Sequence, residues 1–502
     1  MLASVLESDI ESVVRGSDQV DYFVIGSGTA GVTSALELAA AGFNVVIIEA
    51  GPFITANHVG TSPFRSQPEI VPKIHGLVKY ETAWVPEESF NARDKEPYVS
   101  NNTAWSLVGG RTVFWGGCAP RFIDSDFEDW PFGYKEFSPY YDEAEEMIHV
   151  SGTAPTRPPF IRSDWQTLAM ERLNRSGFKA IHAPVSVDTQ SVANGYISQG
   201  FDSSVARLLR SGKLVQFGDK TGVSLLTNTC VTKIDGENGK VTKLHLLKPA
   251  EGKRYEITPK NVILACGGIQ STRLVMSSGL EKDNDVLGKY IGDHIFVQGL
   301  MRLNKPLGLP LYILIQATKN MPFQVQIQGS FEADWYSPYH STVWLDHQST
   351  GLNVLFYCFG IATVEKNNRV AILDEAHCKR GGASSYCVIY DRSEKDKQLI
   401  KQMMESMPEV AKQLDAEVVR IQENPPGAAL HEIGGLRMGD DPNTSITDQY
   451  GRFWRYRNLY AADSSTWRNQ GAANPYLTIT ACALRMARKL VAEKRASLSV
   501  TS

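Results

Sequence analysis

The segment DYFVIGSGTAGVTSALELAAAGFNVVIIEAG, residues 21–51, decides the fold class. Tyr22–Ile25 is a short apolar run, which is typical of a buried parallel strand. A glycine turn follows, and an Ala- and Leu-rich stretch over residues 32–41 predicts a helix that ends at Gly42. Residues 44–48 predict a second strand. The order strand, helix, strand predicts a β-α-β unit and therefore an α/β fold.

The glycine turn has the spacing G-x-G-x-x-G, formed by Gly26, Gly28 and Gly31. The first glycine permits a tight turn, the second lets a pyrophosphate approach the backbone, and the third lets helix and strand pack closely. Glu49 lies 18 residues after Gly31, at the end of the second strand. A carboxylate there accepts hydrogen bonds from ribose hydroxyls and repels a 2′-phosphate. Three glycines also occur in ordinary loops, but this context predicts a dinucleotide site, for FAD or NAD.

Downstream patterns extend the α/β interpretation and add a second sheet. Val231 lies in an expected strand. That strand could pass along an adenine, but Val231 could equally be an ordinary sheet position. A stretch of alternating strand-like segments, turns and aromatics predicts an inserted antiparallel sheet. The expected strands cover residues 225–234, 240–247 and 260–267, the expected helices cover 269–277 and 475–490, and the antiparallel sheet covers about 301–370.

Composition excludes several classes of protein. The 502 residues are 42% hydrophobic with a net charge of −4, which predicts two domains and gives no basic patch for a nucleic acid. We expect no signal peptide and no membrane span. The seven cysteines are scattered and lack C-x-x-C spacing, so we expect neither disulfides nor a metal site, and a reducing, cytoplasmic location.

Four short motifs in the sequence resemble those of a known family. HEIGGLRMG at residues 431–439, NLYAADS at 458–464 and GAANPYLT at 471–478 resemble the C-terminal signature of the glucose-methanol-choline (GMC) oxidoreductases. LGKYIGDH at 287–294 is also similar to that family. GMC oxidoreductases are flavoenzymes that oxidise alcohols, so the resemblance implies an FAD cofactor and a CH–OH donor.

Within the family, the chain most resembles pyranose oxidases. LVGGRTVFWGGCAPRF at residues 107–122 is similar to their flavin-attachment segment, which implies that Gly109 and Gly110 bind the cofactor. QIQGSFEADWY at 326–336, FYCFG at 356–360 and VEKNNRV at 364–370 also have counterparts there. The resemblance implies a ring hydroxyl of a sugar or glycoside as substrate, and O2 or another compound as electron acceptor.

Three departures from the pyranose oxidases change the expectations. Phe114 stands where the fungal enzymes carry the histidine that links the flavin, so we expect non-covalent FAD. Tyr357 stands where an arginine is usual, and the substrate-loop segment lacks several polar residues. These two departures leave the exact alcohol and the position of oxidation open.

The chemistry requires a base for the hydroxyl proton, and His431 is the expected one. An imidazole with a pKa near 6.5 accepts a proton at neutral pH. The resemblance implies that Asn474 hydrogen-bonds the substrate oxygen beside it. On local grounds alone, His431 reads as a core histidine and Asn474-Pro475 as an N-cap followed by a first-turn proline.

The resemblance also implies further contacts. Asp463, Asn474, Pro475 and Thr478 are expected to bind the flavin, although Asp463 also reads as a turn residue at the end of a strand. Expected substrate contacts are Gln326, Trp335 and Tyr357, in an aromatic pocket that would include Trp115 and Tyr336; aromatics at such spacings more often belong to a core.

We therefore expect a Rossmann-type FAD-binding domain interleaved with a substrate domain on a largely antiparallel sheet. The FAD domain would comprise residues 18–56, 100–125, 200–300 and 428–498, and the substrate domain residues 57–99, 126–199 and 301–427. One alternative is a GMC enzyme for a non-sugar alcohol, and another is a flavin-binding protein without activity. The sequence leaves the oligomeric state and the choice between oxidase and dehydrogenase open.

Overall fold

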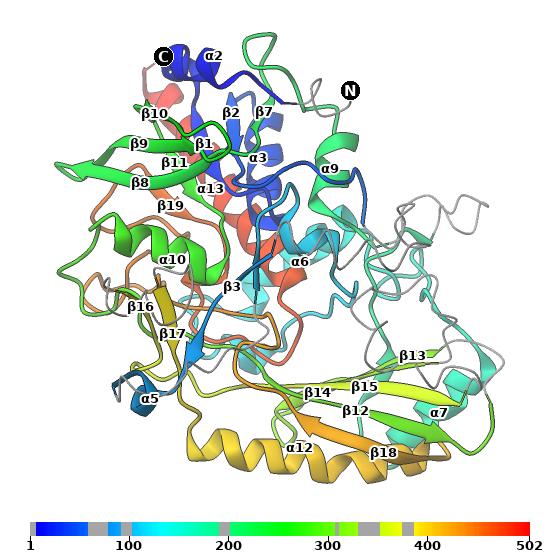
Figure 1. Cartoon of the computed structure of the whole chain (residues 1–502). Helices are drawn as coiled ribbons and strands as arrows, with labels where there is room; N and C mark the ends of the chain where they lie inside the picture. Colours follow the sequence, from blue (N-terminus) through cyan, green and yellow to red (C-terminus); the bar gives the residue numbers. More distant parts are fainter. Residues whose placement is uncertain are drawn as a thin grey trace.

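The computed structural model describes residues 7–58, 79–91, 103–189, 201–306, 311–329, 352–373 and 386–501 (Figure 1). A five-stranded parallel sheet forms the first layer, and its strands are buried apolar runs. Its strand order is β19 (Leu459–Ala461), β11 (Val262–Leu264), β1 (Tyr22–Ile25), β2 (Val45–Ile48) and β7 (Val223–Leu226).

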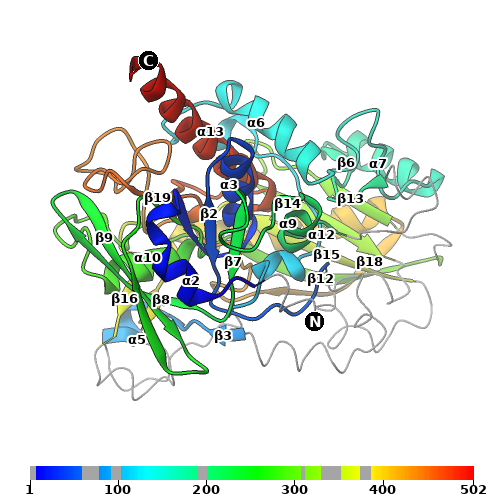
Figure 2. The same cartoon turned by 90° about the horizontal axis from the view of Figure 1, so that it is seen from above.

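The predicted β-α-β unit is confirmed. β1 and β2 pair in parallel and are joined by α3 (Thr29–Ala40), whose small residues permit close packing against the sheet. The last helix, α13 (Tyr476–Thr501), packs beside α3 in both views (Figures 1 and 2). It continues well past the predicted end at residue 490, because the following residues include the strong helix formers Ala, Glu, Lys and Arg.

A three-stranded antiparallel sheet of β8 (Cys230–Glu237), β9 (Lys240–Lys248) and β10 (Lys253–Ile257) lies beside the parallel one. The strand expected over residues 225–234 is two strands, because Asn228 adopts φ +49° and redirects the chain from β7 into β8. The strand β8 runs on past residue 234, the expected end, and includes Asp235 and Gly236. The turn itself is Asn238-Gly239, with φ of +51° and +71°, a pair of signs that suits a tight hairpin.

The predicted antiparallel sheet has six strands and contains the strands described within residues 301–370, apart from β16. α12 (Glu394–Gln413) and α7 (Asp164–Arg175) cover one face, and Figure 1 shows α12 along the underside. The expected domain boundary at residues 300/301 falls inside β12, so the sheet begins earlier than expected. The order is β18 (Ala416–Glu423), β12 (Ile295–Leu303), β15 (Asn353–Gly360), β14 (Phe323–Gly329), β13 (Leu311–Ile315) and β6 (Ala180–His182).

Smaller elements complete the described structure. No described helix has an apolar stretch long enough to cross a bilayer. The remaining strands are β3 (Lys79–Glu81), β4 (Trp84–Val85), β5 (Thr103–Trp105), β16 (Arg369–Ile372) and β17 (Tyr386–Ile389). The remaining helices are α2 (Ile10–Arg15), α5 (Glu87–Asn91), α6 (Tyr134–Met147), α9 (Ser204–Arg210) and α10 (Gly268–Ser277), with short 3-10 turns η1 (Ser17–Gln19), η4 (Gly110–Val113), η5 (Asp124–Phe127) and η9 (Ser464–Thr466).

Candidate functional site

The three glycines of the β1–α3 turn have different surroundings. Gly26 adopts φ +104°, and a Cβ there would lie 2.4 Å from the Ala265 carbonyl oxygen. A Cβ on Gly31 would lie 2.0 Å from the Gly26 carbonyl oxygen. A Cβ on Gly28 would meet no protein atom within 4 Å. The protein itself therefore requires the first and third glycines, whereas the second borders open space.

A hydrogen-bond network joins this turn to the segment around Gly109. The Ser27 hydroxyl donates to Glu49 Oε2 at 2.7 Å and accepts the Gly109 N–H at 2.9 Å. The Ser27 N–H also donates to Glu49 Oε2, and the Gly51 N–H donates to Glu49 Oε1 at 2.9 Å. Glu49 is buried, and burial raises the pKa of its carboxyl. A carboxylate accepts roughly four hydrogen bonds, and three of those of Glu49 come from Ser27 and Gly51. About one remains for a ribose hydroxyl.

The residues at this turn fit a dinucleotide. Gly110 faces Gly28, since a Cβ on Gly110 would lie 3.8 Å from the Gly28 Cα. The first turn of α3 presents N–H groups that have no partner within the helix, which favours an anion such as a pyrophosphate. Gly28, Gly110 and Glu49 are therefore candidates to hold the pyrophosphate and ribose of a dinucleotide such as FAD.

Asp463 closes a second turn nearby. Its carboxylate accepts the Gly267 N–H at 2.9 Å, the Ser271 hydroxyl at 2.6 Å and the Ser465 N–H at 3.0 Å. It therefore fixes the start of α10 and η9, which agrees with the turn interpretation of this residue. Val231 is buried in the core between the two sheets at this end.

The backbone holds His431 from both sides. Its N–H donates to Asp293 Oδ1 at 2.9 Å. The preceding Leu430 adopts φ +62°, a conformation that costs a leucine about 1–3 kcal/mol, and its carbonyl accepts Arg111 Nη1 at 2.7 Å. Such strain persists where the surrounding structure imposes it, and it is often found at functional sites.

The His431 ring contacts His294 and Phe359. The two Nδ1 atoms of His431 and His294 are 2.8 Å apart, and the His431 and Phe359 ring centroids are 5.0 Å apart. Burial, His294 and the Arg111 guanidinium together lower the pKa of His431 well below its ordinary value. The ring is therefore neutral at working pH and able to accept a proton.

Several charged groups lie close to the His431 ring. Arg111 Nη2 donates to Glu432 Oε1 at 2.7 Å. Asp293 is buried, and its Oδ2 has no hydrogen-bond partner among the described residues. Burial and the Glu432 carboxylate raise the pKa of Asp293 to about 7. This part of the site therefore holds one carboxyl that titrates near neutrality.

Asn474 is held by the amide side chains of β14. Its Oδ1 accepts Nε2 of Gln324 at 2.8 Å and Nε2 of Gln326. The Nδ2 donor is therefore the end of the Asn474 amide left for another partner. The expected N-cap is not made by this side chain: the first bond of α13 runs from the Ile479 N–H to the Pro475 carbonyl, at 2.8 Å. Pro475 thus stands one position earlier in the helix start than expected.

The antiparallel sheet presents an uncharged polar and aromatic face towards His431 and Asn474. Gln324, Gln326 and Gln328 alternate along β14 and are 2–4% exposed. In the register, Gln324 pairs with Phe359 and Gln326 pairs with Tyr357. Because Phe359 contacts His431 and Gln324 contacts Asn474, the two expected catalytic residues lie over neighbouring strands of one face.

Two of the four residues of the expected aromatic pocket, Trp115 and Tyr357, are described, and the described aromatic rings beside them are different. Tyr357 packs near Phe296, at a centroid distance of 6.1 Å, on the sheet face. Trp115 instead stacks on Tyr476 at 3.8 Å and donates Nε1–H to the Asp202 carbonyl. Trp335 and Tyr336 lie outside the described residues.

Two further residues are buried in the core. Phe114 is 1% exposed and packs edge-on against Trp105, with centroids 4.4 Å apart. Thr478, expected at the flavin, is fully buried and pairs its hydroxyl with Tyr141 at 2.8 Å. That contact joins α13 to α6 and does not place the threonine hydroxyl at the site.

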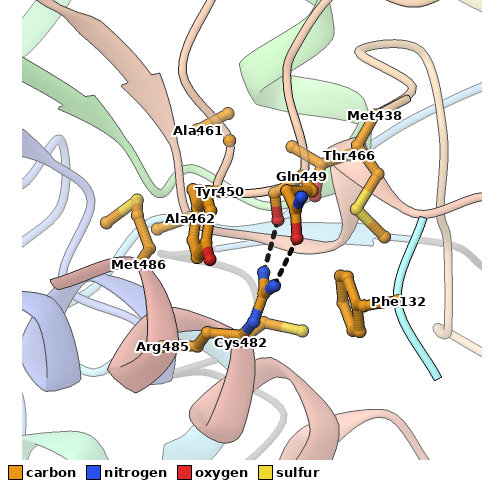
Figure 3. A pocket seen from close by; sticks show the side chains of 11 residues that line it. Phe132, Met438, Gln449, Tyr450, Ala461, Ala462, Thr466, Cys482, Arg485 and Met486 are labelled. Carbon is orange, nitrogen blue, oxygen red and sulfur yellow. Dashed lines mark hydrogen bonds between the residues drawn. The ribbon is translucent and has the colours of Figure 1, made fainter. Parts of the chain in front are cut away.

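A small pocket is lined in part by α13 (Figure 3). Its volume is about 20 Å³, enough for about one water molecule and too small for an alcohol substrate. Arg485 is one of the lining residues and donates to Gln449. Its guanidinium carbon lies 4.0 Å from the ring centroid of Phe132 and 4.1 Å from that of Tyr450. Neither His431 nor Asn474 lines it. The described residues contain no cluster of three potential metal ligands.

Sequence reasoning missed Ser27, His294, Arg111 and Gln324. His294 and Arg111 stand inside segments that carry the family resemblance, so the sequence contained a signal for both. The alternation FQVQIQ at residues 323–328 predicts one polar sheet face and thereby points to Gln324. The role of Ser27 depends on a contact with Gly109, 82 positions away, and has no local signal.

Comparisons with known proteins show the family and the fold of the chain. The family models described as GMC oxidoreductase match residues 20–296 and 373–483. The 2-methyl-1,2-propanediol dehydrogenase of Mycolicibacterium austroafricanum is 26% identical, over 94% of this chain and 95% of its own. The C-glycoside 3-oxidase of Microbacterium trichothecenolyticum is 25% identical, over 96% and 98%. The crystal structure of pyridoxine 4-oxidase from Mesorbium loti shares the fold, with a TM-score of 0.66, 17% identity and coverage of 94% and 99%.

Proposed function

The chain belongs to the GMC oxidoreductase family, whose members bind FAD and oxidise CH–OH groups, and we propose that it oxidises a secondary ring hydroxyl of a pyranose or glycoside with His431 as base. The observation that carries this proposal is the joint position of His431 and Asn474 over one uncharged polar sheet face.

The two side chains have complementary roles. The substrate hydroxyl loses its proton to Nε2 of His431, and the Nδ2–H of Asn474 donates to the same oxygen. Bound FAD would supply the acceptor for the hydride of the carbinol carbon, and O2 or another compound would be the final electron acceptor. The Asn474 bond orients the carbon–hydrogen bond for that transfer.

The sheet face supports a neutral, hydroxyl-rich substrate. Buried amides offer both donors and acceptors, and Gln328 Oε1 is a buried acceptor without a partner among the described residues. A substrate hydroxyl would satisfy it and remove the cost of leaving it unpaired, about 1–3 kcal/mol. Tyr357 and Phe296 add apolar surface suited to the faces of a sugar ring. Three relatives are named C-glycoside 3-oxidase, fructose dehydrogenase large subunit and pyranose 2-oxidase.

We propose that FAD is bound without a covalent link at position 114. A phenyl ring has no atom able to form the bond that a histidine forms, and Phe114 is packed into the core against Trp105.

Anaerobic flavin bleaching tests the proposal without knowledge of the electron acceptor. The FAD-loaded protein is mixed with a panel of monosaccharides, O- and C-glycosides and simple diols, and the flavin absorbance is followed. We expect a glycoside to bleach the flavin fastest. Faster bleaching by a simple diol would favour the second candidate, a non-sugar alcohol, which the aromatic residues on the face and the diol dehydrogenase relative support. Absence of bleaching by every alcohol tested would contradict an enzymatic role.

The assigned base is tested with matched histidine variants. The His431→Ala variant should retain FAD. Its flavin should be reduced by substrate at least ~10²-fold more slowly, which is the usual effect of losing a positioned base. His245→Ala is the control, because that ring lies on the outer β9 hairpin and pairs with Asp235. Asn474→Ala should slow reduction less, since it orients the substrate and takes no proton. Normal reduction of His431→Ala would mean that another residue is the base.

A further inference from the structure

His294 stands directly behind His431 and is itself fully enclosed. It follows Asp293 at the start of β12 and is 2% exposed. Its Nδ1 is 2.8 Å from Nδ1 of His431, and its Nε2 is 2.8 Å from the carbonyl oxygen of Gly471. The two rings are nearly perpendicular, at 89°. Both nitrogens of His294 therefore have a partner.

The proton positions follow from these partners. A carbonyl oxygen only accepts hydrogen bonds, so the Nε2 of His294 carries a proton. Burial lowers the pKa of His294 to about 4, so the ring is neutral at working pH. A neutral imidazole carries one proton, which leaves the Nδ1 of His294 as an acceptor. The contact between the rings then requires a proton on the Nδ1 of His431.

We propose that His294 is a positioning residue that holds His431 as the Nδ1–H tautomer and thereby leaves its Nε2 free to take the alcohol proton. The inference rests on the proposed function, in which His431 is the base. No described residue hydrogen-bonds the Nε2 of His431, so that lone pair is available to a substrate. The role parallels the partner of a catalytic histidine that selects the tautomer of the ring.

The pair orients the proton acceptor and does not carry the proton away. When the substrate proton arrives at Nε2, His431 becomes doubly protonated and still donates its Nδ1–H to His294. The chain of hydrogen bonds ends at the Gly471 carbonyl, which takes no proton. The nearby groups are the Asp293 carboxyl at the His431 backbone, the Arg111–Glu432 ion pair and the Phe359 ring.

Two amide variants separate this role from general support of the fold. An asparagine side chain places its amide where the Nδ1 of histidine lies, and a glutamine side chain places it near Nε2. His294→Asn can accept from His431, whereas His294→Gln can reach the Gly471 carbonyl and not the His431 ring. We expect anaerobic flavin reduction to slow at least ~10-fold in the Gln variant, and most of the rate to be restored in the Asn variant. Equal rates in the two variants would overturn the proposal.

Nitrogen NMR of the FAD-loaded protein reads the tautomer without any substrate. With ¹⁵N-labelled histidine at pH 8, the signals that disappear in His431→Ala belong to that ring. We expect them to show a protonated Nδ1 and an unprotonated Nε2 in the wild type and in His294→Asn, and a shift towards protonated Nε2 in His294→Gln. A protonated Nε2 on His431 in the wild type refutes the proposal, even if neither variant folds. Because this measurement needs no turnover, it remains separate from a failure of the proposed function.

Discussion

Replacement of two glycines in the same turn by alanine should have opposite effects on the apoprotein. In Gly31→Ala, the new Cβ would lie 2.0 Å from the Gly26 carbonyl oxygen, where carbon and oxygen normally stay more than 3 Å apart. The turn and α3 must separate to relieve this contact. Such overpacking costs about 1–3 kcal/mol, and the backbone on both sides of the contact places this site at the upper end.

Gly28→Ala is the matched variant, three residues earlier. Its Cβ would meet no protein atom within 4 Å, and the native φ of −64° and ψ of −175° are accessible to alanine. Removing a glycine from such a position stabilises a protein by about 0.4–1 kcal/mol, because the unfolded chain loses conformational freedom. The same methyl group would occupy the path of the pyrophosphate, so FAD affinity should fall sharply.

Two measurements on each variant decide between these expectations. Urea unfolding of the FAD-free proteins gives the free energy of unfolding, and flavin fluorescence titration gives the dissociation constant of FAD. We expect Gly28→Ala to be as stable as the wild-type apoprotein or more so, with at least ~10-fold weaker FAD binding, about 1.4 kcal/mol. Gly31→Ala should be clearly less stable. Wild-type FAD affinity in Gly28→Ala, or wild-type stability in Gly31→Ala, would refute the reasoning.

Three further predictions concern the cofactor, the amide face and a buried carboxyl. Acid precipitation should release all FAD into the supernatant, because Phe114 cannot hold it; flavin that stays with the denatured chain would disprove this. Gln326→Leu should lower kcat about 10- to 10²-fold with little change in KM, because Gln326 holds the Asn474 amide; a raised KM at normal kcat would mean direct substrate contact. Because the folded-state pKa of Asp293 is raised to about 7, the folded protein retains a proton that the unfolded chain loses near pH 4, so wild-type stability falls as the pH rises through this window. Asp293→Asn should remove that fall. The difference in unfolding free energy between variant and wild type should therefore be up to roughly 4 kcal/mol more favourable to the variant at pH 8 than at pH 4. A difference that does not change with pH would contradict the raised pKa.

Local patterns were enough for the nucleotide half of the fold. The apolar runs of β1 and β2, the helix between them and the three glycines are signals over about 30 consecutive residues, and each has a direct steric meaning. The alternation along β14 likewise encodes one polar face. The same local reasoning merged β7 and β8 into one strand, because both are apolar and only the positive φ of Asn228 separates them.

By itself, the sequence determined the α/β class and the dinucleotide turn. Through the family motifs it also identified His431 and Asn474 as the expected catalytic residues. Only the tertiary structure decided how those two side chains are oriented. His294 and His431 are 137 positions apart, and Gln324 and Asn474 are 150 positions apart. The tautomer of a histidine and the orientation of an amide depend on which donor or acceptor lies within about 3 Å. Here the packing of the antiparallel sheet against the nucleotide domain brings that neighbour into place. No local sequence pattern predicts this packing.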